Sequence, residues 1–469
     1  MGAGGAHAPL APWKMRAVMR YFALQDRGTT VRREVLGGVV TFLTMSYIVF
    51  VNPAILSSAG LPFNAVAVAT ALAAAGFTIL MGVATNLPFA LASGLGINAV
   101  VAFDIILGRK VSPDVGMACI VLEGAVAVVL VLAGFREAVV RAVPSSLKLA
   151  IGVGIGLFIT LVGLRDGGIV VNNPATGIGL GDLTSGPALI ALAGILAALG
   201  LSAAGVRGAI LFGIATSTIL GLIFGVLDGP SAIARWPHSG DFSTIGDGLS
   251  GHALSDALTW TLVPVIFSLF MTDFFDTVGT AYAVTSAGGL LDENGEVPKI
   301  KPLLLVDSLA AAGGGAMGVS SVTTYVESGA GVAEGARTGL ASVVTGLLFA
   351  LTIFFVPLIA VVGQGVAVSK DTVIHPAVAP ALVMVGYLMI QLVRGIDWDA
   401  PEDAVPAFLV IAGVPLTFSI SAGIGLGVFG YVVTMLARRR AREIHPIMWA
   451  LVPLFAAFFA SGWLSSHVF

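Results

Sequence analysis

Residues 317–332 read MGVSSVTTYVESGAGV, and residues 81–97 read MGVATNLPFALASGLGI. The two stretches align with one gap, since both begin Met-Gly-Val and both end Ser-Gly-x-Gly followed by Ile or Val. A second pair of similar stretches, residues 187–213 and 406–430, follows in the same order. One apolar match arises easily by chance, but two in the same order indicate that the chain consists of two related halves.

The composition is that of a membrane protein. Hydrophobic residues make up 57% of the 469-residue chain and charged residues only 10%, whereas soluble proteins carry about a quarter charged residues. Apolar runs of roughly 18 or more residues recur along the chain, and such runs predict transmembrane helices. The runs do not alternate with period two, so a transmembrane β-barrel is disfavoured, and a soluble multidomain enzyme is excluded.

Fifteen hydrophobic segments can be delimited, and we expect the first fourteen to cross the membrane. They lie at 35–56, 64–86, 89–106, 114–134, 147–164, 187–204, 208–227, 259–284, 302–316, 321–333, 337–362, 373–393, 405–421, 423–437 and 447–465. An odd number of spans in each half turns the second half upside down. The predicted fold is therefore an all-α polytopic membrane protein with seven plus seven segments in an inverted repeat.

Segments 89–106 and 321–333 differ from ordinary spans because they are short and rich in glycine and hydroxyl groups. They are also the segments that contain the first internal match. Interrupted segments at corresponding positions of two halves are the best sequence indication of a transporter binding site near the bilayer midplane.

The lysines and arginines predict the orientation. With a cytoplasmic N-terminus and fourteen crossings, 18 of the 23 basic residues fall inside the cell. The five outside are Arg109, Lys110, Arg165, Arg235 and Lys370. We therefore expect a multi-pass protein of the plasma membrane, in contact with the lipid bilayer, whose N-terminus is cytoplasmic.

The two ends of the chain and its overall charge carry smaller predictions. Residues 1–34 are basic and amphipathic and predict a cytoplasmic lead-in on the membrane surface, with a disordered tail as the alternative. Residues 438–469 combine a basic stretch with the extra segment 447–465, which spans or lies at the periphery. The net charge of −3 gives no indication of nucleic-acid binding, and the single Cys119 allows no intrachain disulfide.

Several acidic residues fall at membrane depth, among them Asp273 and Asp276 in TDFFDTVGT and Glu327 in TTYVESGAG. An ionisable group at the centre of a spanning helix costs about 2.5–3.5 kcal/mol on insertion scales and usually marks a substrate or ion path. Asp273, Thr277 and Thr280 lie at i, i+4 and i+7, so they share one helix face. The alternative is that the carboxyl groups are protonated or paired and only tie helices together.

Other polar residues in the segments divide into one ligand candidate and several structural ones. Asn98 in GLGINA, at the end of the matching segment in the first half, is the candidate, with an interhelical hydrogen bond as its alternative role. We expect Glu123 and Asp307 to be packing or network residues. Asp104 and Arg337 are expected at segment ends near the interface.

The residue types narrow the ligand. The central segments contain no lysine or arginine, so an anionic substrate would lack a strong partner there. Carboxylates and an amide suit a neutral planar solute with N–H donors, such as a nucleobase, and a cation is the competing interpretation. A carboxyl group desolvated in such a cavity could also load and release a coupling proton. No nucleophile–base pair or metal cluster stands out, so we expect no enzyme, no metal and no cofactor beyond the coupling ion.

The motifs GLGINA, TDFFDTVGT and TTYVESGAGVAEGARTGL, with the opening RREVLGGVVTFLTMSYIVFVNPAIL, resemble those of a known family. The chain is similar to the AzgA-like purine permeases of the nucleobase–ascorbate transporter group, from about Tyr21 to Arg440. That resemblance implies fourteen segments in two domains, a core or transport domain and a gate domain. The core would comprise residues 35–134 and 259–362, and the gate residues 147–227 and 373–437. It also implies that the third and tenth segments each contain a short strand and a half-helix, and that these strands pair at the substrate site.

The resemblance also implies site residues. Asn98, Asp273 and Glu327 are similar to the residues that hold the base in related permeases, and Asp276 stands three residues before Gly279, where the wider group has an acid. Thr280 stands where that group often has a histidine or an acid. The expected substrate-binding set is Asp273, Glu327, Asn98, Asp276, Thr277, Ser328, Thr324 and Gly96. The candidates for proton coupling are Asp276, Asp273 and Glu327.

Together these features predict a secondary active transporter that imports adenine, guanine and hypoxanthine by proton symport through alternating access. The alternatives are a transporter of another neutral heterocycle or of an anion on the same fold, or a channel. A homodimer formed through the gate domain is expected from the same resemblance.

Overall fold

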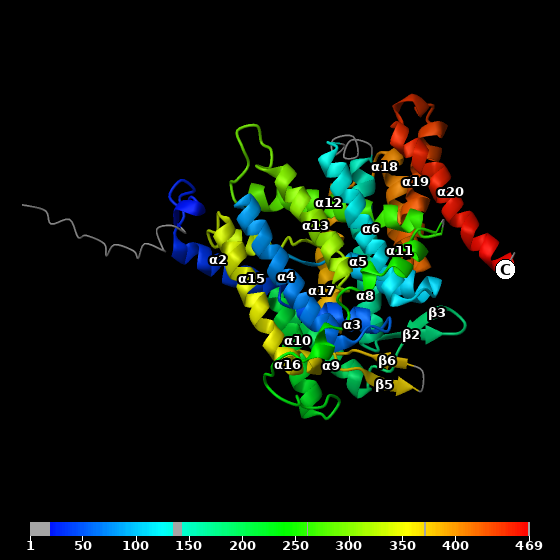
Figure 1. The fold of residues 1–469 in the computed structure, drawn as a ribbon. Coiled ribbons are helices and arrows are strands. Elements are labelled where there is room, and N and C mark those ends of the chain that lie inside the picture. Colours follow the sequence, from blue (N-terminus) through cyan, green and yellow to red (C-terminus); the bar gives the residue numbers. More distant parts are fainter. Residues whose placement is uncertain (1–18, 135–142, 260, 370–371, 468–469) are drawn as a thin grey trace, which may run out of the picture.

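The structure is a computed structural model that describes residues 19–134, 143–259, 261–369 and 372–467. Within these ranges the chain is mostly helical (Figure 1). Most of the expected N-terminal lead-in, residues 1–18, lies outside the described residues.

The first half contains helices and three short strands in the following order. They are α2 (Val31–Met45), α3 (Ile48–Ser57), α4 (Phe63–Thr85), β1 (Leu91–Ser93), α5 (Leu95–Ala99), the π-helix η1 (Val100–Gly108), α6 (Pro113–Leu132), α8 (Ser145–Asp166), β2 (Val170–Asn173), β3 (Gly177–Leu180), α9 (Gly186–Ala203) and α10 (Ala209–Ile223).

A connecting region with three short helices leads to the second half. Its helices are η2 (Ser239–Phe242), η3 (Asp247–Leu249) and α11 (Gly251–Ala257). The second half comprises α12 (Val263–Ala287), α13 (Ile300–Ala316), β4 (Val322–Thr324), α14 (Ser328–Ala333), α15 (Gly339–Thr352), η4 (Ile353–Phe355), α16 (Val356–Val362), β5 (Val366–Ser369), β6 (Thr372–Ile374), α17 (Ala379–Ile390), η5 (Gln391–Gly395), α18 (Pro401–Thr417), α19 (Ile420–Ala437), η6 (Ala441–Glu443) and α20 (Pro446–His467).

Each of the fifteen expected segments coincides with a helix or with a strand followed by a helix. Eight helical stretches of the described chain are long and apolar enough to cross a membrane by length and composition. Several other apolar helices are shorter, among them Leu95–Gly108, Ala209–Ile223 and Ala379–Gly395. The fold is thus that of a multi-pass membrane protein, while the count of fourteen crossings remains a prediction.

Helix packing depends on close approach at small residues. Helix α4 packs along α15, and α6 packs along α13; the blue and yellow ribbons of the first pair run side by side in Figure 1. A Cβ atom added to Gly339 would lie 1.9 Å from the carbonyl oxygen of Gly82, and one added to Gly124 would lie 2.3 Å from the backbone nitrogen of Ala312. Small residues at such contacts let helix backbones approach closely, as is common in membranes.

The strands of the two interrupted segments form one antiparallel pair. Leu91 pairs with Thr324, Ala92 with Thr323 and Ser93 with Val322. Two backbone hydrogen bonds extend the pair, from Gly94 N–H to Ser321 at 2.8 Å and from Tyr325 N–H to Ala90 at 3.0 Å. These bonds satisfy non-helical backbone groups inside the protein, which is the condition for such backbone at membrane depth.

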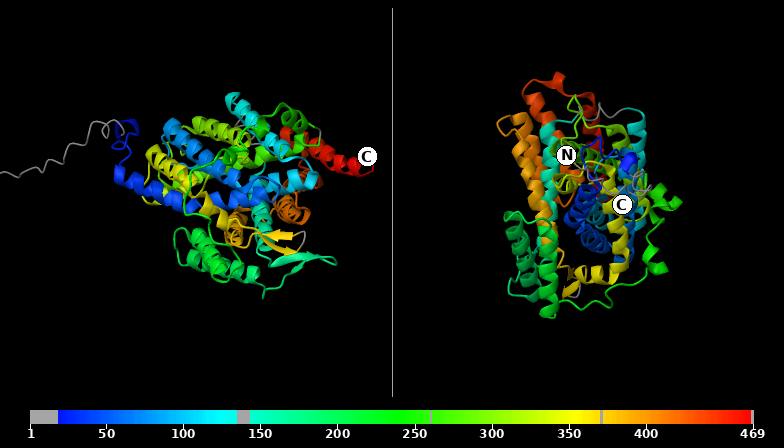
Figure 2. Two further views of the ribbon diagram at one scale, coloured as in Figure 1. Left: turned by 60° about the horizontal axis from the view of Figure 1, so that its bottom comes forward. Right: turned by 90° about the vertical axis from the view of Figure 1, so that its left-hand side faces the viewer.

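Two hairpins depart from the sequence prediction. Strands β2 and β3 pair with each other, as do β5 and β6, and the hairpins lie side by side in Figure 1 and in the left view of Figure 2. The expected helix 373–393 was wrong at its start, where β6 stands, and α17 begins only at Ala379. Pro376 explains the late start, because a proline disfavours helical conformation in the residue before it.

The boundary between the last two expected segments also differs. Helix α18 ends at Thr417, and Phe418 adopts a left-handed conformation with φ 53°. Ser419 then caps α19 by accepting a hydrogen bond from the Ala422 N–H. The expected end of one segment at residue 421 and the expected start of the next at residue 423 were therefore wrong. Continuous hydrophobicity does not reveal a break made by a single capping residue.

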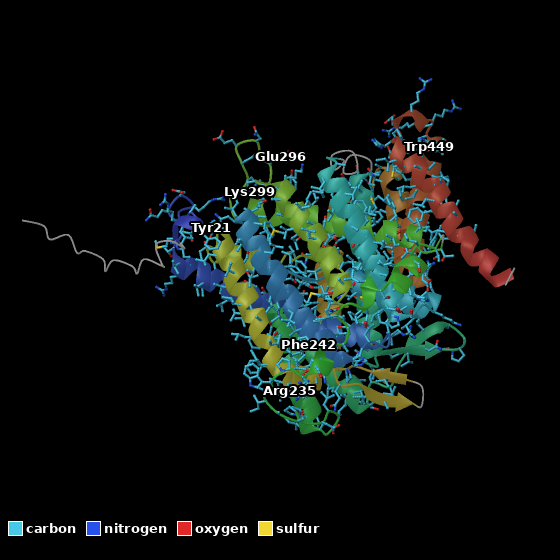
Figure 3. The ribbon with its side chains drawn as sticks, viewed as in Figure 1. Tyr21, Arg235, Phe242, Glu296, Lys299 and Trp449 are labelled. Carbon is cyan, nitrogen blue, oxygen red and sulfur yellow. The ribbon has the colours of Figure 1, made fainter. Side chains whose placement is uncertain are left out.

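The two ends of the helices carry different groups. Figure 3 places Glu296, Lys299 and Trp449 toward one end and Arg235 and Phe242 toward the other. Arg235 and Asp241 form a bidentate ion pair at that second end, with nitrogen–oxygen distances of 2.5 and 2.8 Å. The hydrogen bond from Arg235 holds the pKa of the Asp241 carboxyl below its usual value.

Candidate functional site

The candidate site lies where α12 passes the strand pair β1–β4 and helix α14. Asp273 on α12 is buried, with 2% of its surface exposed. The Ser321 hydroxyl, directly before β4, lies 3.3 Å from its Oδ1 and donates to it. Because Ser321 belongs to the interrupted segment, the tenth segment orients this carboxyl group.

Asp276 and Glu327 form the accessible part of the site. Asp276 is exposed and Glu327 is half-buried, and their carboxyl groups are close enough to interact electrostatically. The Tyr47 hydroxyl, between α2 and α3, donates to Glu327 Oε1 at 2.5 Å. The site thus presents two acceptor groups, one of which is fixed in position by a buried tyrosine.

Asp307 on α13 links α12 to the strand pair. It accepts hydrogen bonds from Thr277 Oγ1 at 2.7 Å and from Thr323 Oγ1 at 3.2 Å. It also accepts from the Thr324 backbone N–H at 3.0 Å. Thr277, which was expected to contact substrate, therefore uses its hydroxyl group in a structural network in this conformation.

Asn98 on α5 is fully buried and only partly hydrogen-bonded. The Ser93 hydroxyl lies 2.8 Å from Asn98 Oδ1 and also contacts the Val319 carbonyl. Tyr325 fixes Ser93 in turn by donating to its carbonyl oxygen at 2.5 Å. Among the described residues, Asn98 Nδ2 has no hydrogen-bond partner, so its two donors are unused in this conformation.

The remaining expected site residues, Ser328, Thr324 and Gly96, lie in or next to the interrupted segments and differ in their contacts. Ser328 Oγ accepts a hydrogen bond from the Ala90 N–H at 3.0 Å. Thr324 Oγ1 is buried without a hydrogen-bond partner among the described residues. Gly96 packs against Ile155 of α8, where an added Cβ would lie 2.7 Å from the isoleucine side chain.

Helix α12 has two different faces beyond Asp273. Asp273, Thr277 and Thr280 are buried on one face, as their spacing predicts. Asp276, Gly279, Ala283 and Ser286, at i, i+3, i+7 and i+10, are exposed on the other. Between Leu262 and Phe274, by contrast, this helix has no exposed residue.

The exposed face of α12 therefore runs from Asp276 to the end of the helix at Ala287. No atom lies within 4 Å of a Cβ added at Gly279, nor at Gly329 of α14. An acidic side chain on a path of small residues is consistent with an aqueous access route, since intramembrane acids usually face water-filled cavities.

Sequence reasoning missed four partners of the site: Tyr47, Ser93, Ser321 and Tyr325. Two of them could have been found from the sequence, because Ser321 and Tyr325 belong to the repeated stretch MGVSSVTTYVESGAGV. Asp307 was predicted to be a network residue, but its contacts with Thr277, Thr323 and Thr324 were not predicted. Tyr47 carried no signal beyond being one of six tyrosines.

The described parts of the chain contain no group of three or more His, Cys, Asp or Glu residues that could hold a metal ion. A surface cleft of about 510 Å³ has none of the expected site residues in its lining, which includes Phe63, Asp241 and Gln364. Those polar groups are already paired, Asp241 with Arg235 and Gln364 with Asp228.

Comparisons with known proteins agree on the class of the chain. The model of a permease family, Xan_ur_permease, matches residues 32–426. The guanine/hypoxanthine permease PbuG of Bacillus subtilis is 39% identical over 450 residues, which cover 94% of this chain and 98% of that protein. The adenine permease AdeP of Escherichia coli is 38% identical over 437 residues, covering 93% of this chain and 94% of that one.

A solved structure shows the same fold at low identity. The transmembrane domain of a cyanobacterial bicarbonate transporter, BicA, superposes with a TM-score of 0.59 at 15% identity, covering 83% of this chain and 97% of that one.

Proposed function

The chain belongs to the permease family that Xan_ur_permease describes, and we propose that it carries purine nucleobases across the membrane. Membership of this family makes it a transport protein and not an enzyme. The resemblance to purine permeases, predicted from the motifs around Asn98, Asp273 and Glu327, is confirmed by relatives with purine permease names at 38–39% identity.

The observation that carries the proposal is the chemistry of the polar groups beside the strand pair. Asp276 and Glu327 offer carboxylate acceptors, and Asn98 offers unused N–H donors. A purine base has ring N–H or amino groups for the former and ring nitrogens or a carbonyl for the latter. An anion would meet two acids and no cationic side chain among these residues, which disfavours it.

We assign the residues as follows. Glu327, held by Tyr47, and Asp276 accept hydrogen bonds from the base, and Asn98 donates to it. Asp273 lies buried behind them and is held by Ser321. It interacts with Asp276 as a like charge, so ionisation of one carboxyl group disfavours ionisation of the other. Thr324, with its free hydroxyl, is the remaining polar neighbour, while Thr277, Ser328 and Gly96 shape the strand pair around the base.

Packing supports the proposed division into core and gate. Helices α4, α6, α13 and α15 pack among themselves, as do α8, α9, α10, α17, α18 and α19. The right view of Figure 2 shows the long α8 beside the orange helices of the second set. Each of these pairs joins one helix of the first half to one helix of the second half. The pair α4–α15 corresponds to the pair α13–α6 when the two halves are interchanged, as expected for an inverted repeat.

We further propose that the protein works by alternating access and that this conformation is open to the cytoplasm. The exposed face of α12 leads from Asp276 toward the end that carries Lys299 and the basic stretch Arg438–Arg440. With a cytoplasmic N-terminus, that end is the inner one. A proton is the proposed coupling ion.

The experiment is uptake of labelled hypoxanthine by cells that express the chain, with unlabelled adenine, guanine, xanthine or uracil as competitors. We expect saturable uptake that purines block and uracil does not. Equal uptake by expressing and control cells, with the protein present and folded in the membrane, would refute purine transport. Large currents without saturation would indicate a channel instead.

A further inference from the structure

Glu123 on α6 has no place in the site described above, and its environment is unusual. Its side chain is 0% exposed. Among the described residues, neither of its carboxyl oxygens has a hydrogen-bond partner. An unpaired charge buried in this way is costly enough that a carboxyl group takes up a proton instead. The geometry therefore favours a neutral, protonated Glu123 in this conformation.

The packing around Glu123 prevents it from turning toward water. Its neighbour Gly124 touches the backbone of α13, where an added Cβ would lie 2.3 Å from the Ala312 nitrogen. One turn along the same seam, a Cβ added to Gly315 would lie 2.7 Å from the Val121 nitrogen. Helices α6 and α13 are thus in backbone contact on either side of the carboxyl group, which stays in the interior.

The acidic neighbours of Glu123 lead to the substrate site. Its carboxyl group interacts electrostatically with Asp307 on α13 and with Asp273 on α12. Asp307 accepts three hydrogen bonds, including one from the Thr324 backbone in β4. Carboxyl chains of this kind form proton relays in membrane transporters.

Other ionisable groups on elements packed against α6 are engaged elsewhere or exposed. His252 and Asp256 of α11 pair with each other, and Asp104 of η1 pairs with Arg109. Asp247 of η3 is exposed. Asp307 and Asp273 are therefore the groups toward which a proton on Glu123 can move.

We propose that Glu123 is the site that holds the coupling proton, and that this proton moves between Glu123 and Asp307 during transport. In the step, the O–H bond of the Glu123 carboxyl breaks and an O–H bond forms on the Asp307 carboxylate. The Glu123 carboxylate left behind must gain a hydrogen-bond donor or a new proton in the next conformation, because it has no partner among the described residues in this one. A protonated Asp307 loses acceptor capacity toward Thr277, Thr323 and the Thr324 N–H. Strand β4 and helix α12 at the substrate site thereby respond to the position of the proton.

The same geometry favours a proton over a metal ion. A metal cation needs several oxygen atoms arranged around it, whereas the described residues contain no group of three or more His, Cys, Asp or Glu side chains that could hold one. A proton needs only the carboxyl group itself.

The inference rests on the proposed function, and its test separates the two. Purified protein in liposomes is assayed for purine exchange, with labelled purine outside and unlabelled purine inside, and for purine-driven proton entry, with a pH-sensitive dye inside. Glu123→Gln mimics the protonated carboxyl, so we expect purine exchange within about twofold of the native rate and proton entry reduced at least tenfold. Glu123→Asp, which retains a titratable group, should restore part of the proton entry.

The matched control is Glu34→Gln. Glu34 is equally buried, but it accepts hydrogen bonds from the Arg337 and Thr338 backbones, so this variant should keep the native proton-to-purine ratio. An infrared spectrum of the purified protein gives a second readout: the C=O band of a protonated carboxyl should be weaker in Glu123→Gln. An unchanged band, or native proton entry in Glu123→Gln, would overturn the proposal. Absence of purine exchange in the native protein would instead overturn the proposed function.

Discussion

At the residue scale, the carboxyl groups near the strand pair differ in what donates to them. Asp307 has three donors and serves the fold. Glu327 has the Tyr47 hydroxyl, and Asp276 is exposed. A carboxylate that keeps accessible oxygen atoms can exchange water for a ligand, whereas one whose acceptors are occupied cannot do so without disrupting its network.

The Tyr47–Glu327 contact gives a direct prediction. Hydrogen bonds to charged groups contribute about 1.5–3 kcal/mol, so Tyr47→Phe should weaken purine binding by roughly tenfold or more by leaving Glu327 less well positioned. The measurement is the Kd for hypoxanthine of purified protein, by calorimetry. Tyr387→Phe, at an exposed position of α17, is the control and should bind like the native protein. Native affinity in Tyr47→Phe would remove the tyrosine from the account.

The sequence indicated candidate acids at membrane depth but not the side chains that hydrogen-bond to them. Asp273, Asp276 and Glu327 could be chosen because charges are rare at membrane depth and each costs free energy there. Tyr47 and Glu327 are separated by 280 residues, and tyrosine and serine are common enough in apolar helices that nothing singled out Tyr47 or Ser93. Asn98 was predicted as a substrate ligand, and only the structure reveals that its Nδ2 donors have no described hydrogen-bond partner.

At the element scale, helix α12 has one buried face that contacts neighbouring elements and one exposed face that carries Asp276. Its buried face contacts α13 and β4 through Thr277, whereas its exposed face carries Asp276 and small residues down to Ser286. Helical periodicity predicted the first face from the spacing of Asp273, Thr277 and Thr280. It could not predict the second, because exposure of Gly279 and Ala283 depends on where the neighbouring helices stop.

Two alanines of α12 test the access route. Ala281 is 0% exposed and Ala283 is exposed, although they lie two positions apart. We expect Ala283→Cys to react with a membrane-impermeant thiol reagent on the cytoplasmic side at least tenfold faster than Ala281→Cys, and excess purine to slow that reaction. The native Cys119 is fully buried and gives a low background. Equal labelling of the two variants would contradict an open path along this face.

Two glycines test the role of close helix contact. A Cβ at Gly124 would meet the α13 backbone, whereas Gly76 of α4 has no atom within 4 Å of that position. Gly124→Ala should therefore lower the melting temperature of the purified protein, by overpacking that costs about 1–3 kcal/mol. Gly76→Ala should leave it unchanged or raise it slightly, because alanine favours a helix. A melting temperature equal to the native one in Gly124→Ala would show that α6 and α13 can separate.

The strand pair and the hairpins illustrate the limits at this scale. The β1–β4 pair was predicted through family resemblance, from two short glycine-rich stretches. The hairpins β2–β3 and β5–β6 were missed because each strand has only three or four residues, too few to show alternation against an apolar background.

At the scale of the whole molecule, polar contacts join the proposed core and gate at opposite ends of the helices. Asp104, at the end of the third segment, accepts a 2.6 Å hydrogen bond from Ser419, the cap of α19. Arg207, between α9 and α10, forms an ion pair with Glu334, directly after α14. If the core moves against the gate, these contacts must change during transport.

The Arg207–Glu334 pair can be tested by charge exchange. Exposed ion pairs contribute up to about 1 kcal/mol, so Arg207→Glu should destabilise the present conformation and lower the labelling rate of Ala283→Cys about two- to fivefold. The double variant Arg207→Glu, Glu334→Arg should restore the rate. A labelling rate that neither change affects would mean that this ion pair does not bias the conformation.

Among the described residues, each of the fifteen hydrophobic segments contains a helix, because burial in lipid demands long apolar runs, whereas the short polar helices η2, η3 and α11 were not predicted. How the two sets of helices meet depends on contacts between residues far apart in sequence, such as Asp104 with Ser419, which no local pattern encodes.

The most direct test of purine transport through this site is exchange of labelled hypoxanthine by purified protein in liposomes preloaded with unlabelled hypoxanthine, comparing the native chain with Asp273→Asn and Glu327→Gln. The account predicts saturable exchange by the native protein and at least a hundredfold slower exchange by both folded variants. Native rates in both variants would contradict the site, and absence of exchange by the folded native protein would contradict purine transport itself.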